Sequence, residues 1–584
     1  MTAKVTTLSI KPGIQRDGTQ FAADGYVDGE WVRFQRGMPR KIGGYNGIFL
    51  NGSGISRGMT MTSTGGLNYV VSGYWAGVEG WSTDNDDGVG FGPTPYTISY
   101  GFTANDNNLW QFDVGYDSYG AGASKLIAHP GQNLTAIDST INTRPLYGPF
   151  PGSTLAPVGV FTATGTTNST AVFTLDASNA AVGAGVSITG AGIPSGTTVV
   201  SVVGTAVTMS AAATASASIT ATFDNNISVS GGVVMLHPYL FVYGNDGLIQ
   251  NCAAGDFNNW TSSDSNANNV ASGKIVKGLP IRGGTNSPSG LFWSLDSVIR
   301  VSYSPSTVNG LNFYWRYDLL TSQTSIMSSQ SVIEYDGIFY WAGVDRFLSY
   351  NGVVQEVPNT QNQNYFFDNL NYAQRQKVWV SKVPRFGEIW WFYPKGDATE
   401  CTDAIIYNTR EKVWYDAGQA LGARRSAGAF SEVFRNPIWS GNEINSQGKY
   451  TIWQHEKGVN QIYLTNVNAI RSMFETCNLG LVTGGPGNPQ LVGDNLWARI
   501  DRVEPDFVQE GEMTVTVTGK GYANDEDIAS QPYPFDSTTL KIDMREQRRE
   551  LRLKFQSNTE NGNYQMGKVL ISVEGGDVRS TGNP

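Results

Sequence analysis

Cysteine, histidine and charged residues are scarce in this chain of 584 residues. It has three Cys and three His, and Asp, Glu, Lys and Arg make up 15% of it. The thiols of Cys252, Cys401 and Cys477 are odd in number and far apart, which excludes a disulfide framework or a CxxC metal cluster and favours buried free thiols. The His residues show no HExxH motif and no paired spacing, so we expect no His-based zinc site and no metal or cofactor.

Long apolar runs are also missing. The opening residues, MTAKVTTLSI, have no apolar core behind a basic start, and no window approaches 18 apolar residues, so we expect neither a secretory signal nor a membrane span. A formal net charge of -10 argues against a surface built to clamp nucleic acid. This net charge is still compatible with a channel through which DNA passes without being bound.

Turn formers and flat rings are abundant instead. The chain holds 69 Gly, 12% aromatic residues and 15 Trp. Few charges, many turns and many rings are typical of short strands with tight connections. We therefore expect a mainly β protein of several domains.

One stretch has a composition of its own. No Lys or Arg occurs from Pro145 to Gly273, and residues 158–223 are almost all Ala, Ser, Thr, Val and Gly, with β-branched segments broken by Gly or Pro. This pattern predicts a small immunoglobulin-like β-sandwich inserted into the main fold. A disordered linker is disfavoured, because strand formers are too frequent.

A looser pattern recurs on both sides of the insert. An aromatic strand, an Asp-Gly or Asn-Gly turn and a second strand repeat in units of roughly 40 to 60 residues, as propeller blades do. Rings such as Trp293, Trp341 and Trp390 are expected to pack between about six or seven blades, although exposed rings on a carbohydrate-binding surface would give the same pattern. From about Thr476 a third region alternates with period two, which predicts a separate antiparallel β domain.

These patterns predict four parts. Residues 1–155 hold N-terminal strands and the first blades, 156–226 the inserted sandwich, 227–475 the remaining blades, and 476–584 the C-terminal antiparallel β domain.

Catalytic motifs are poor. The single GxSxG match, GISRG around Ser56, lacks a following helix pattern, and no phosphate-binding loop occurs. Two catalytic carboxylates could hide among the 50 Asp and Glu, so a propeller glycosidase stays open as a minor alternative. The expectation from sequence is that the chain has no catalytic residues and is not an enzyme.

The densest run of charge is MREQRRELRLK, which contains Arg545, Arg548, Arg549 and Arg552. Glu546 and Glu550 lie between these cations, and no ring lies inside the run. We interpret it as a face that contacts a neighbouring strand or subunit, or solvent, with DNA contact as the weaker alternative.

The two ends of the chain carry a family resemblance. GIQRDGTQFAADGYVDGEWVRFQRGMPRKIGGY near the N-terminus and RRELRLKFQSNTENGNYQMGKVLISVEGGD near the C-terminus resemble the bacteriophage stabilisation family, the tail hub or nozzle proteins of short-tailed phages. The likeness is strongest over residues 10–45 and 540–578. The insert departs from a minimal version of the family's pattern.

The resemblance implies a structural protein of the virion tail, made in the host cytoplasm, that forms a homohexameric ring below the portal and adaptor. Such a ring closes the portal channel, retains the packaged double-stranded DNA and forms part of the ejection conduit, with tail fibre, tailspike or needle proteins as further partners. Arg33, Arg36, Arg40 and Lys41 are then candidates for subunit contacts. The alternative from another class is a glycan-binding propeller that acts as a receptor-binding or adhesive module.

Overall fold

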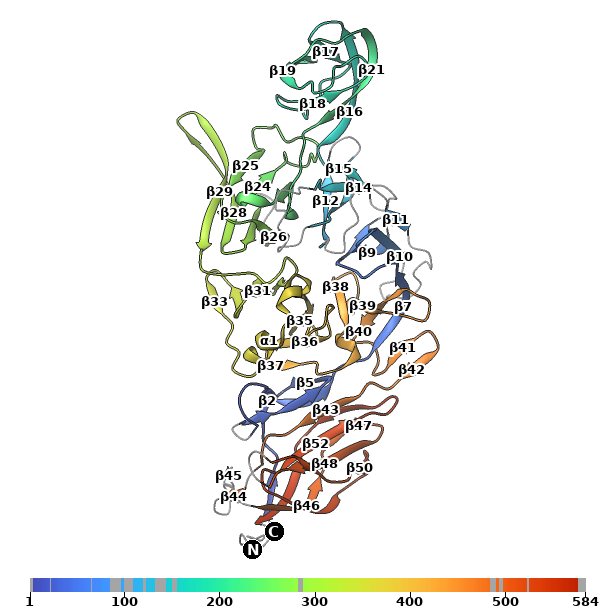
Figure 1. Ribbon diagram of the computed structural model, residues 1–584, viewed down its shortest axis with the longest axis vertical. Coiled ribbons are helices and arrows are strands. Elements are labelled where there is room, and N and C mark those ends of the chain that lie inside the picture. Colours follow the sequence, from blue (N-terminus) through green and yellow to red (C-terminus); the bar gives the residue numbers. More distant parts are fainter. Residues whose placement is uncertain are drawn as a thin grey trace. The chain divides into compact units, whose positions relative to one another are not determined.

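The protein is described by a computed structural model from Lys4 to Gly575, except for residues 21–22, 65, 84–95, 99–108, 119–121, 132–142, 150–154, 282–286, 480, 484–489, 493–496 and 522–524. The chain divides into two compact units, Gly52–Glu356 and the combination of Met1–Asn51 with Val357–Pro584. Nearly all the regular structure is β, as predicted (Figure 1). None of the described helices is long and apolar enough to cross a membrane.

The unit Gly52–Glu356 contains five four-stranded antiparallel sheets, each made of strands consecutive in the chain. The strands are β8 (Gly58–Thr64), β9 (Leu67–Tyr74), β10 (Gly77–Thr83) and β11 (Tyr96–Ile98); β12 (Gln111–Asp117), β13 (Ala123–His129), β14 (Leu146–Pro149) and β15 (Ala156–Pro157); β22 (Gly232–Leu236), β23 (Tyr239–Tyr243), β24 (Leu248–Asn251) and β25 (Asn266–Asn269); β26 (Ile275–Ile281), β27 (Ser289–Ser294), β28 (Val298–Val308) and β29 (Leu311–Thr321); β30 (Val332–Tyr335), β31 (Ile338–Ala342), β32 (Phe347–Tyr350) and β33 (Val354–Glu356). A short 3-10 helix, η1 (Asn245–Gly247), joins β23 to β24.

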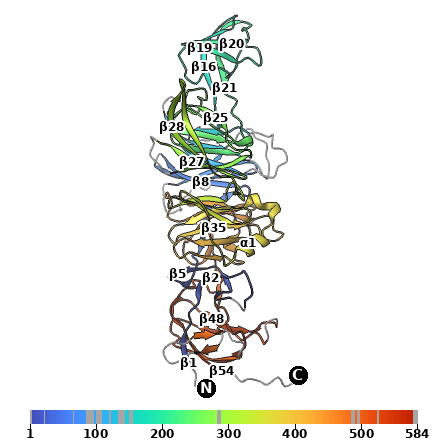
Figure 2. The same cartoon turned by 90° about the vertical axis from the view of Figure 1, so that its left-hand side faces the viewer.

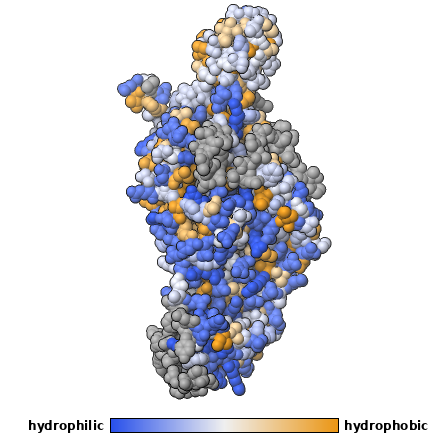
Figure 3. Space-filling model, viewed as in Figure 1, coloured by the Kyte–Doolittle hydropathy of each residue, from blue (hydrophilic) through white to orange (hydrophobic). Residues whose placement is uncertain are grey.

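These sheets are propeller blades. The first strands of successive sheets lie side by side, β8 next to β12, β12 next to β22, and β22 next to β26. The side-chain amide of Gln111 connects three successive sheets, because it donates to Gly231 O at 2.9 Å and to Val276 O at 3.1 Å. Two of the rings predicted to pack between blades do so, since Trp293 and Trp341 lie on successive sheets, are buried and have ring centroids 5.8 Å apart. The fourth blade also projects a hairpin of β28 and β29 whose exposed face mixes polar residues with the apolar Val308 and Phe313 (Figures 1 and 3).

The inserted module lies between β15 and β22 and has its own core (Figure 2). Its strands form one sheet in the order β18-β21-β16-β17-β20-β19. Val199 N donates to Val186 O at 2.8 Å, so backbone hydrogen bonds also join the two edges of the sheet, which curls around Phe173 and Phe223. The strands are β16 (Val160–Asn168), β17 (Val172–Leu175), β18 (Ser187–Thr189), β19 (Val199–Val203), β20 (Ala206–Met209) and β21 (Ser216–Asp224).

The other unit contains two more blade-like sheets. One is β34 (Trp379–Val383), β35 (Glu388–Tyr393), β36 (Asp403–Asn408) and β37 (Val413–Asp416), preceded by α1 (Gln363–Asn369) and η2 (Tyr372–Lys377). The second follows η3 (Leu421–Ala423) and runs in the order β38 (Arg425–Ala429), β39 (Ile438–Ile444), β40 (Tyr450–His455), β7 (Tyr45–Gly52), β41 (Gln461–Tyr463) and β42 (Asn466–Asn468). An N-terminal strand, β7, thus completes a sheet whose other strands lie about 400 positions later in the chain.

The C-terminal β region is built jointly with N-terminal strands. Its three larger sheets have the orders β1-β54-β46-β51, β4-β43-β52-β48-β49 with β50 on β48, and β47-β53-β6-β5 (Figures 1 and 2). From the N-terminus come β1 (Lys4–Thr7), β4 (Asp28–Glu30), β5 (Val32–Gln35) and β6 (Met38–Lys41), while β2 (Lys11–Ile14) and β3 (Gly25–Tyr26) form a small parallel pair. The later strands are β43 (Ser472–Glu475), β44 (Leu481–Thr483), β45 (Gln490–Val492), β46 (Ala498–Glu504), β47 (Phe507–Glu510), β48 (Met513–Gly519), β49 (Ile528–Ala529), β50 (Tyr533–Phe535), β51 (Ile542–Arg548), β52 (Arg552–Ser557), β53 (Asn563–Met566) and β54 (Leu570–Gly575).

Cys252, Cys401 and Cys477 are buried, as the sequence predicts. Two of the His residues, His129 and His455, are also buried among hydrogen-bond partners. Ser56, from the GxSxG match, is buried and bonded to Ser72 Oγ at 2.8 Å.

Candidate functional site: an aromatic pocket beside Arg425

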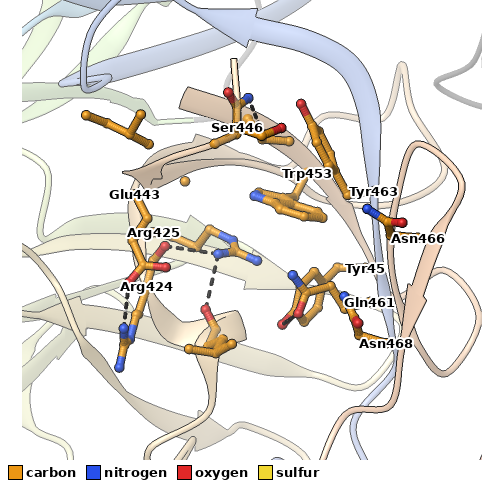
Figure 4. A pocket seen from close by; sticks show the side chains of 15 residues that line it. Tyr45, Arg424, Arg425, Glu443, Ser446, Trp453, Gln461, Tyr463, Asn466 and Asn468 are labelled. Atoms are coloured by element: carbon orange, nitrogen blue, oxygen red, sulfur yellow. Dashed lines mark hydrogen bonds and ion pairs between the residues drawn. The ribbon is translucent and has the colours of Figure 1, made fainter. Parts of the chain in front are cut away.

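A pocket of about 320 Å³ lies on the sheet that β7 completes (Figure 4). All of its lining comes from β7, η3, β38 to β42 and the segments that join them, so one unit supplies the whole site. The lining residues are Tyr45, Leu421, Arg424, Arg425, Gly441, Glu443, Ile444, Asn445, Ser446, Thr451, Trp453, Gln461, Tyr463, Asn466 and Asn468.

Three aromatic side chains form one side of this pocket. Tyr45 and Trp453 meet edge to face with ring centroids 5.2 Å apart, and Trp453 lies 6.0 Å from Tyr463. Gly441 leaves room beside Trp453, because a Cβ built there would come within 3.1 Å of the indole nitrogen. Trp453 thus contacts both tyrosine rings, and the three form one continuous aromatic wall.

Amide side chains surround the rings. Tyr45 donates its hydroxyl proton to Gln461 Oε1 at 3.2 Å, while Asn445 Nδ2 donates to Thr451 Oγ1 at 2.9 Å. Asn466 and Asn468 are exposed at the pocket edge. Amides carry both donors and acceptors, so this rim can bond hydroxyl groups in either direction.

Arg425 reaches into the pocket between Trp453 and Tyr45 (Figure 4). Its guanidinium carbon lies 4.8 Å from the Tyr45 ring centroid and 5.2 Å from that of Trp453. Nη1 donates to Leu421 O at 3.2 Å and to Arg424 O at 3.0 Å, and Nε donates to His455 Nε2 at 2.9 Å. Burial lowers the pKa of Arg425 to about 10, with partial compensation from Tyr45 and from the charge of Glu443, so the side chain is still cationic at neutral pH.

His455 has a supporting role behind this arginine. His455 Nε2 must be unprotonated to accept the hydrogen bond from Arg425 Nε. Burial together with the Arg425 charge holds the pKa of His455 well below its usual range. The imidazole also stacks on Tyr45, with centroids 5.1 Å apart. It therefore fixes both the guanidinium and one wall of the pocket.

Two buried polar groups at the pocket have no hydrogen-bond partner among the described residues: Arg425 Nη2 and the Tyr463 hydroxyl. Leaving such groups unpaired costs on the order of 1–3 kcal/mol each. A ligand that enters the pocket would supply the missing hydrogen-bond partners of such groups.

The residues predicted from the N-terminal segment lie elsewhere. Arg33 is buried between Glu388 and Glu456, with Nε 2.8 Å from Glu388 Oε1 and Nη2 2.6 Å from Glu456 Oε1. Burial alone would lower the pKa of Arg33, but these two carboxylates more than offset it and hold the pKa above its ordinary value. The charge is thus satisfied within the chain.

The neighbours of Arg33 differ in exposure. Lys41 is buried and donates to Gly562 O at 2.6 Å, and burial lowers its pKa to about 8. Arg40 is partly buried and donates to Gln35 Oε1 at 2.7 Å, while Arg36 is exposed. A subunit contact by Arg33 or Lys41 would require a buried side chain to leave its partners; for Arg36 and Arg40 the role stays a prediction.

The C-terminal arginines do not share one face. Arg545 is exposed, Arg548 pairs with Glu546 at 3.0 Å, and Arg549 donates to Gly521 O at 3.2 Å. Arg552 is buried, with Nε 3.0 Å from Glu475 Oε1 and Nη2 2.5 Å from Asp527 Oδ1. Arg552 is therefore covered although it lies on the face of the strand opposite Leu551 and Leu553. The predicted contact with a neighbouring strand fits this residue.

The pocket was missed by sequence reasoning. The sequence pattern places Trp453 and His455 in a blade, but it contains no motif at Arg425 or Tyr463. Tyr45 reaches the pocket only because β7 pairs with the strands of this sheet. No cluster of three or more His, Cys, Asp or Glu that could hold a metal ion occurs among the described residues.

No family model and no curated protein matches the chain. Among solved structures, the chain is similar to an exo-β-1,3-galactanase from Phanerochaete chrysosporium, at 9% identity over 91% of this chain and 99% of that chain, with a TM-score of 0.26. It is also similar to a GH43 protein from Bacillus licheniformis, at 8% identity over 90% and 99% of the two chains and a TM-score of 0.21. A putative exported protein from Bacteroides fragilis matches 39% of this chain and 89% of its own at 10% identity, with a TM-score of 0.17.

These neighbours correct one prediction. The expectation that the chain is not an enzyme is not kept, since an exo-galactanase is among the solved structures to which the chain is similar. Identities of 10% or lower and TM-scores of 0.26 or lower transfer no activity and no substrate to this protein.

Proposed function

We propose that the protein is a β-propeller that binds glycans through the pocket beside Arg425. The observation that carries this proposal is that Tyr45, Trp453 and Tyr463 line a cavity that also holds unpartnered polar groups and amides. A sugar ring presents apolar C–H faces that pack on aromatic rings and hydroxyl groups that bond amides and guanidinium groups. A receptor-binding or adhesive role follows from such a site.

Replacing one ring tests the proposal. Tyr463→Ala should weaken binding to the best ligand from a glycan array at least tenfold, because it removes both an aromatic contact and a hydroxyl that has no hydrogen-bond partner among the described residues. The matched control is Tyr372→Ala, an exposed tyrosine of the same unit that does not line the pocket. Affinities are measured by calorimetry after array screening.

Two results would count against glycan binding at this site: an array with no signal above background, or equal losses for the two tyrosine variants. Chromatography of the oligosaccharide after incubation shows in the same samples whether it is shortened. That measurement separates a binding module from a glycosidase.

A second proposal is that the chain is a tail hub or nozzle subunit of a short-tailed phage. One observation favours it: the two segments that carry the resemblance, residues 10–45 and 540–578, pack together. β6 pairs with β53, and Lys41 Nζ donates to Gly562 O. Segments 500 residues apart in the chain therefore form one structural element. The proposal includes the homohexamer, the adaptor and portal ring, tail fibre, tailspike or needle proteins, and DNA in the channel.

Electron-microscope class averages of the purified protein, alone and mixed with its tail adaptor, test the hub proposal. Sixfold rings are expected, because the family resemblance implies a homohexamer. A protein that stays monomeric with the adaptor present would rule the proposal out. The two proposals are compatible, since a virion component can also carry a sugar-binding pocket.

A further inference from the structure

Arg425 differs from the other strongly buried arginines of its unit. Arg33 is held by Glu388 and Glu456, and Arg552 by Glu475 and Asp527. Arg425 is as buried as these, yet it forms no ion pair with a carboxylate among the described residues. Its hydrogen bonds go to two carbonyl groups and a neutral imidazole, and the Tyr45 hydroxyl also stabilises its charge. A buried cation without a counter-ion is costly to maintain.

The nearest acidic residue of the pocket does not fill this role. Glu443 lies at the rim with its side chain 58% exposed, and its Oε1 pairs with Arg424 Nη1 at 2.5 Å. Its charge is therefore already matched by the neighbouring arginine. The free nitrogen of Arg425, Nη2, is left between rings in the pocket (Figure 4).

We infer that the ligand of this pocket carries a carboxylate, and that the protein is specific for acidic glycans, those that contain uronic or sialic acid. The inference rests on the proposed glycan binding and adds the charge of the ligand. The carboxylate accepts a hydrogen bond from Arg425 Nη2 and supplies the missing counter-ion, while the ring of the sugar packs on Trp453 and Tyr463. Charge-assisted bonds of this kind are roughly twice as strong as neutral ones.

The first experiment changes the ligand and leaves the protein intact. An array of neutral glycans and of glycans with uronic or sialic acid is probed with the wild-type protein before and after methyl esterification of the carboxyl groups. We expect binding to the acidic members and at least a tenfold loss after esterification, because the ester keeps the sugar and removes the charge.

The second experiment changes the protein. Arg425→Gln should weaken binding of the acidic ligand at least tenfold more than it weakens binding of the methyl ester, since the charged pair is lost for the acid alone. The matched control is Arg385→Gln, an exposed arginine of the same unit outside this pocket. Circular dichroism confirms that the variants are folded, and the ester comparison remains decisive if Arg425→Gln does not fold.

The outcomes separate this inference from the proposed function. Binding of neutral and acidic glycans with equal affinity, unchanged by esterification, would overturn the acidic specificity and leave glycan binding intact. No binding to any member would overturn both. Acid-dependent binding that Arg425→Gln does not change would place the carboxylate elsewhere and overturn the role of Arg425.

Discussion

Replacement of Arg33 by Met is expected to lower the free energy of unfolding of its unit by about 3–5 kcal/mol at neutral pH. Met keeps much of the stem volume but leaves the carboxylates of Glu388 and Glu456 without their shared cation. Arg33 contacts both at 2.6–3.0 Å, and its guanidinium lies 3.6 Å from the Phe386 ring centroid, so no water replaces it easily. Denaturant unfolding, followed by tryptophan fluorescence and by hydrogen exchange of β5 and β35 peptides, measures the loss unit by unit.

The pH dependence of this loss has a definite sign. Burial raises the pKa of Glu388, and Arg33 partly opposes that rise. Without Arg33 the folded-state pKa goes higher still, so the folded state takes up a proton before the unfolded chain does. As the pH falls toward that raised pKa, the free energy of unfolding of the variant should increase relative to that of the wild type. The difference in stability between the two proteins should therefore become smaller.

Two further variants make the result specific. Arg36→Met removes an exposed side chain from the same hairpin and should change stability by less than about 0.5 kcal/mol. The triple variant Arg33→Met, Glu388→Gln, Glu456→Gln removes the whole charge cluster and should recover much of the loss. If Arg33→Met were as mild as Arg36→Met, the buried cluster would not be a stabilising element.

The blades could be predicted from sequence because their signal is local. Short aromatic strands between two turn motifs indicate a blade whose two faces are both covered. The rings of Phe339, Trp341, Trp390 and Trp391 lie in such strands, and all four are buried. The period-two pattern of β52 likewise placed Leu551, Leu553 and Phe555 on one buried face. It could not show that the face of Arg552 is covered too, because alternation does not reveal what packs on the second side of a central strand.

The candidate site could not be predicted because it depends on long-range pairing. Tyr45 contributes to the pocket only after β7 has joined β40 and β41. Neither Tyr45 nor Arg425 belongs to a motif that specifies this partner. The same holds for Arg33, whose basic neighbours suggested a surface although its acidic partners follow some 350 and 420 residues later.

Replacement of Trp31 by Ala should have an effect of similar size for a different reason. Trp31 is fully buried, its indole NH donates to Gly43 O at 3.0 Å, and its ring lies 5.8 Å from the rings of both Tyr45 and Trp390. Truncation removes this packing and leaves a cavity, which typically costs about 3–5 kcal/mol. The backbone φ of 51° at this position is equally unfavourable for Ala, so the loss reports on the side chain. Denaturant unfolding measures it.

Trp75→Ala is the matched control, since that tryptophan is 46% exposed and its removal should cost less than about 1 kcal/mol. Gly422→Ala tests the same packing from the other side, because an added Cβ would lie 2.2 Å from the Trp31 ring and must displace it. Trp31 also supports Tyr45 and lies 6.4 Å from His455, which together hold the Arg425 pocket. Trp31→Ala should therefore weaken ligand binding as well, under conditions where the variant is still folded. A loss of stability without any loss of affinity would show that the pocket is shaped independently of the N-terminal segment.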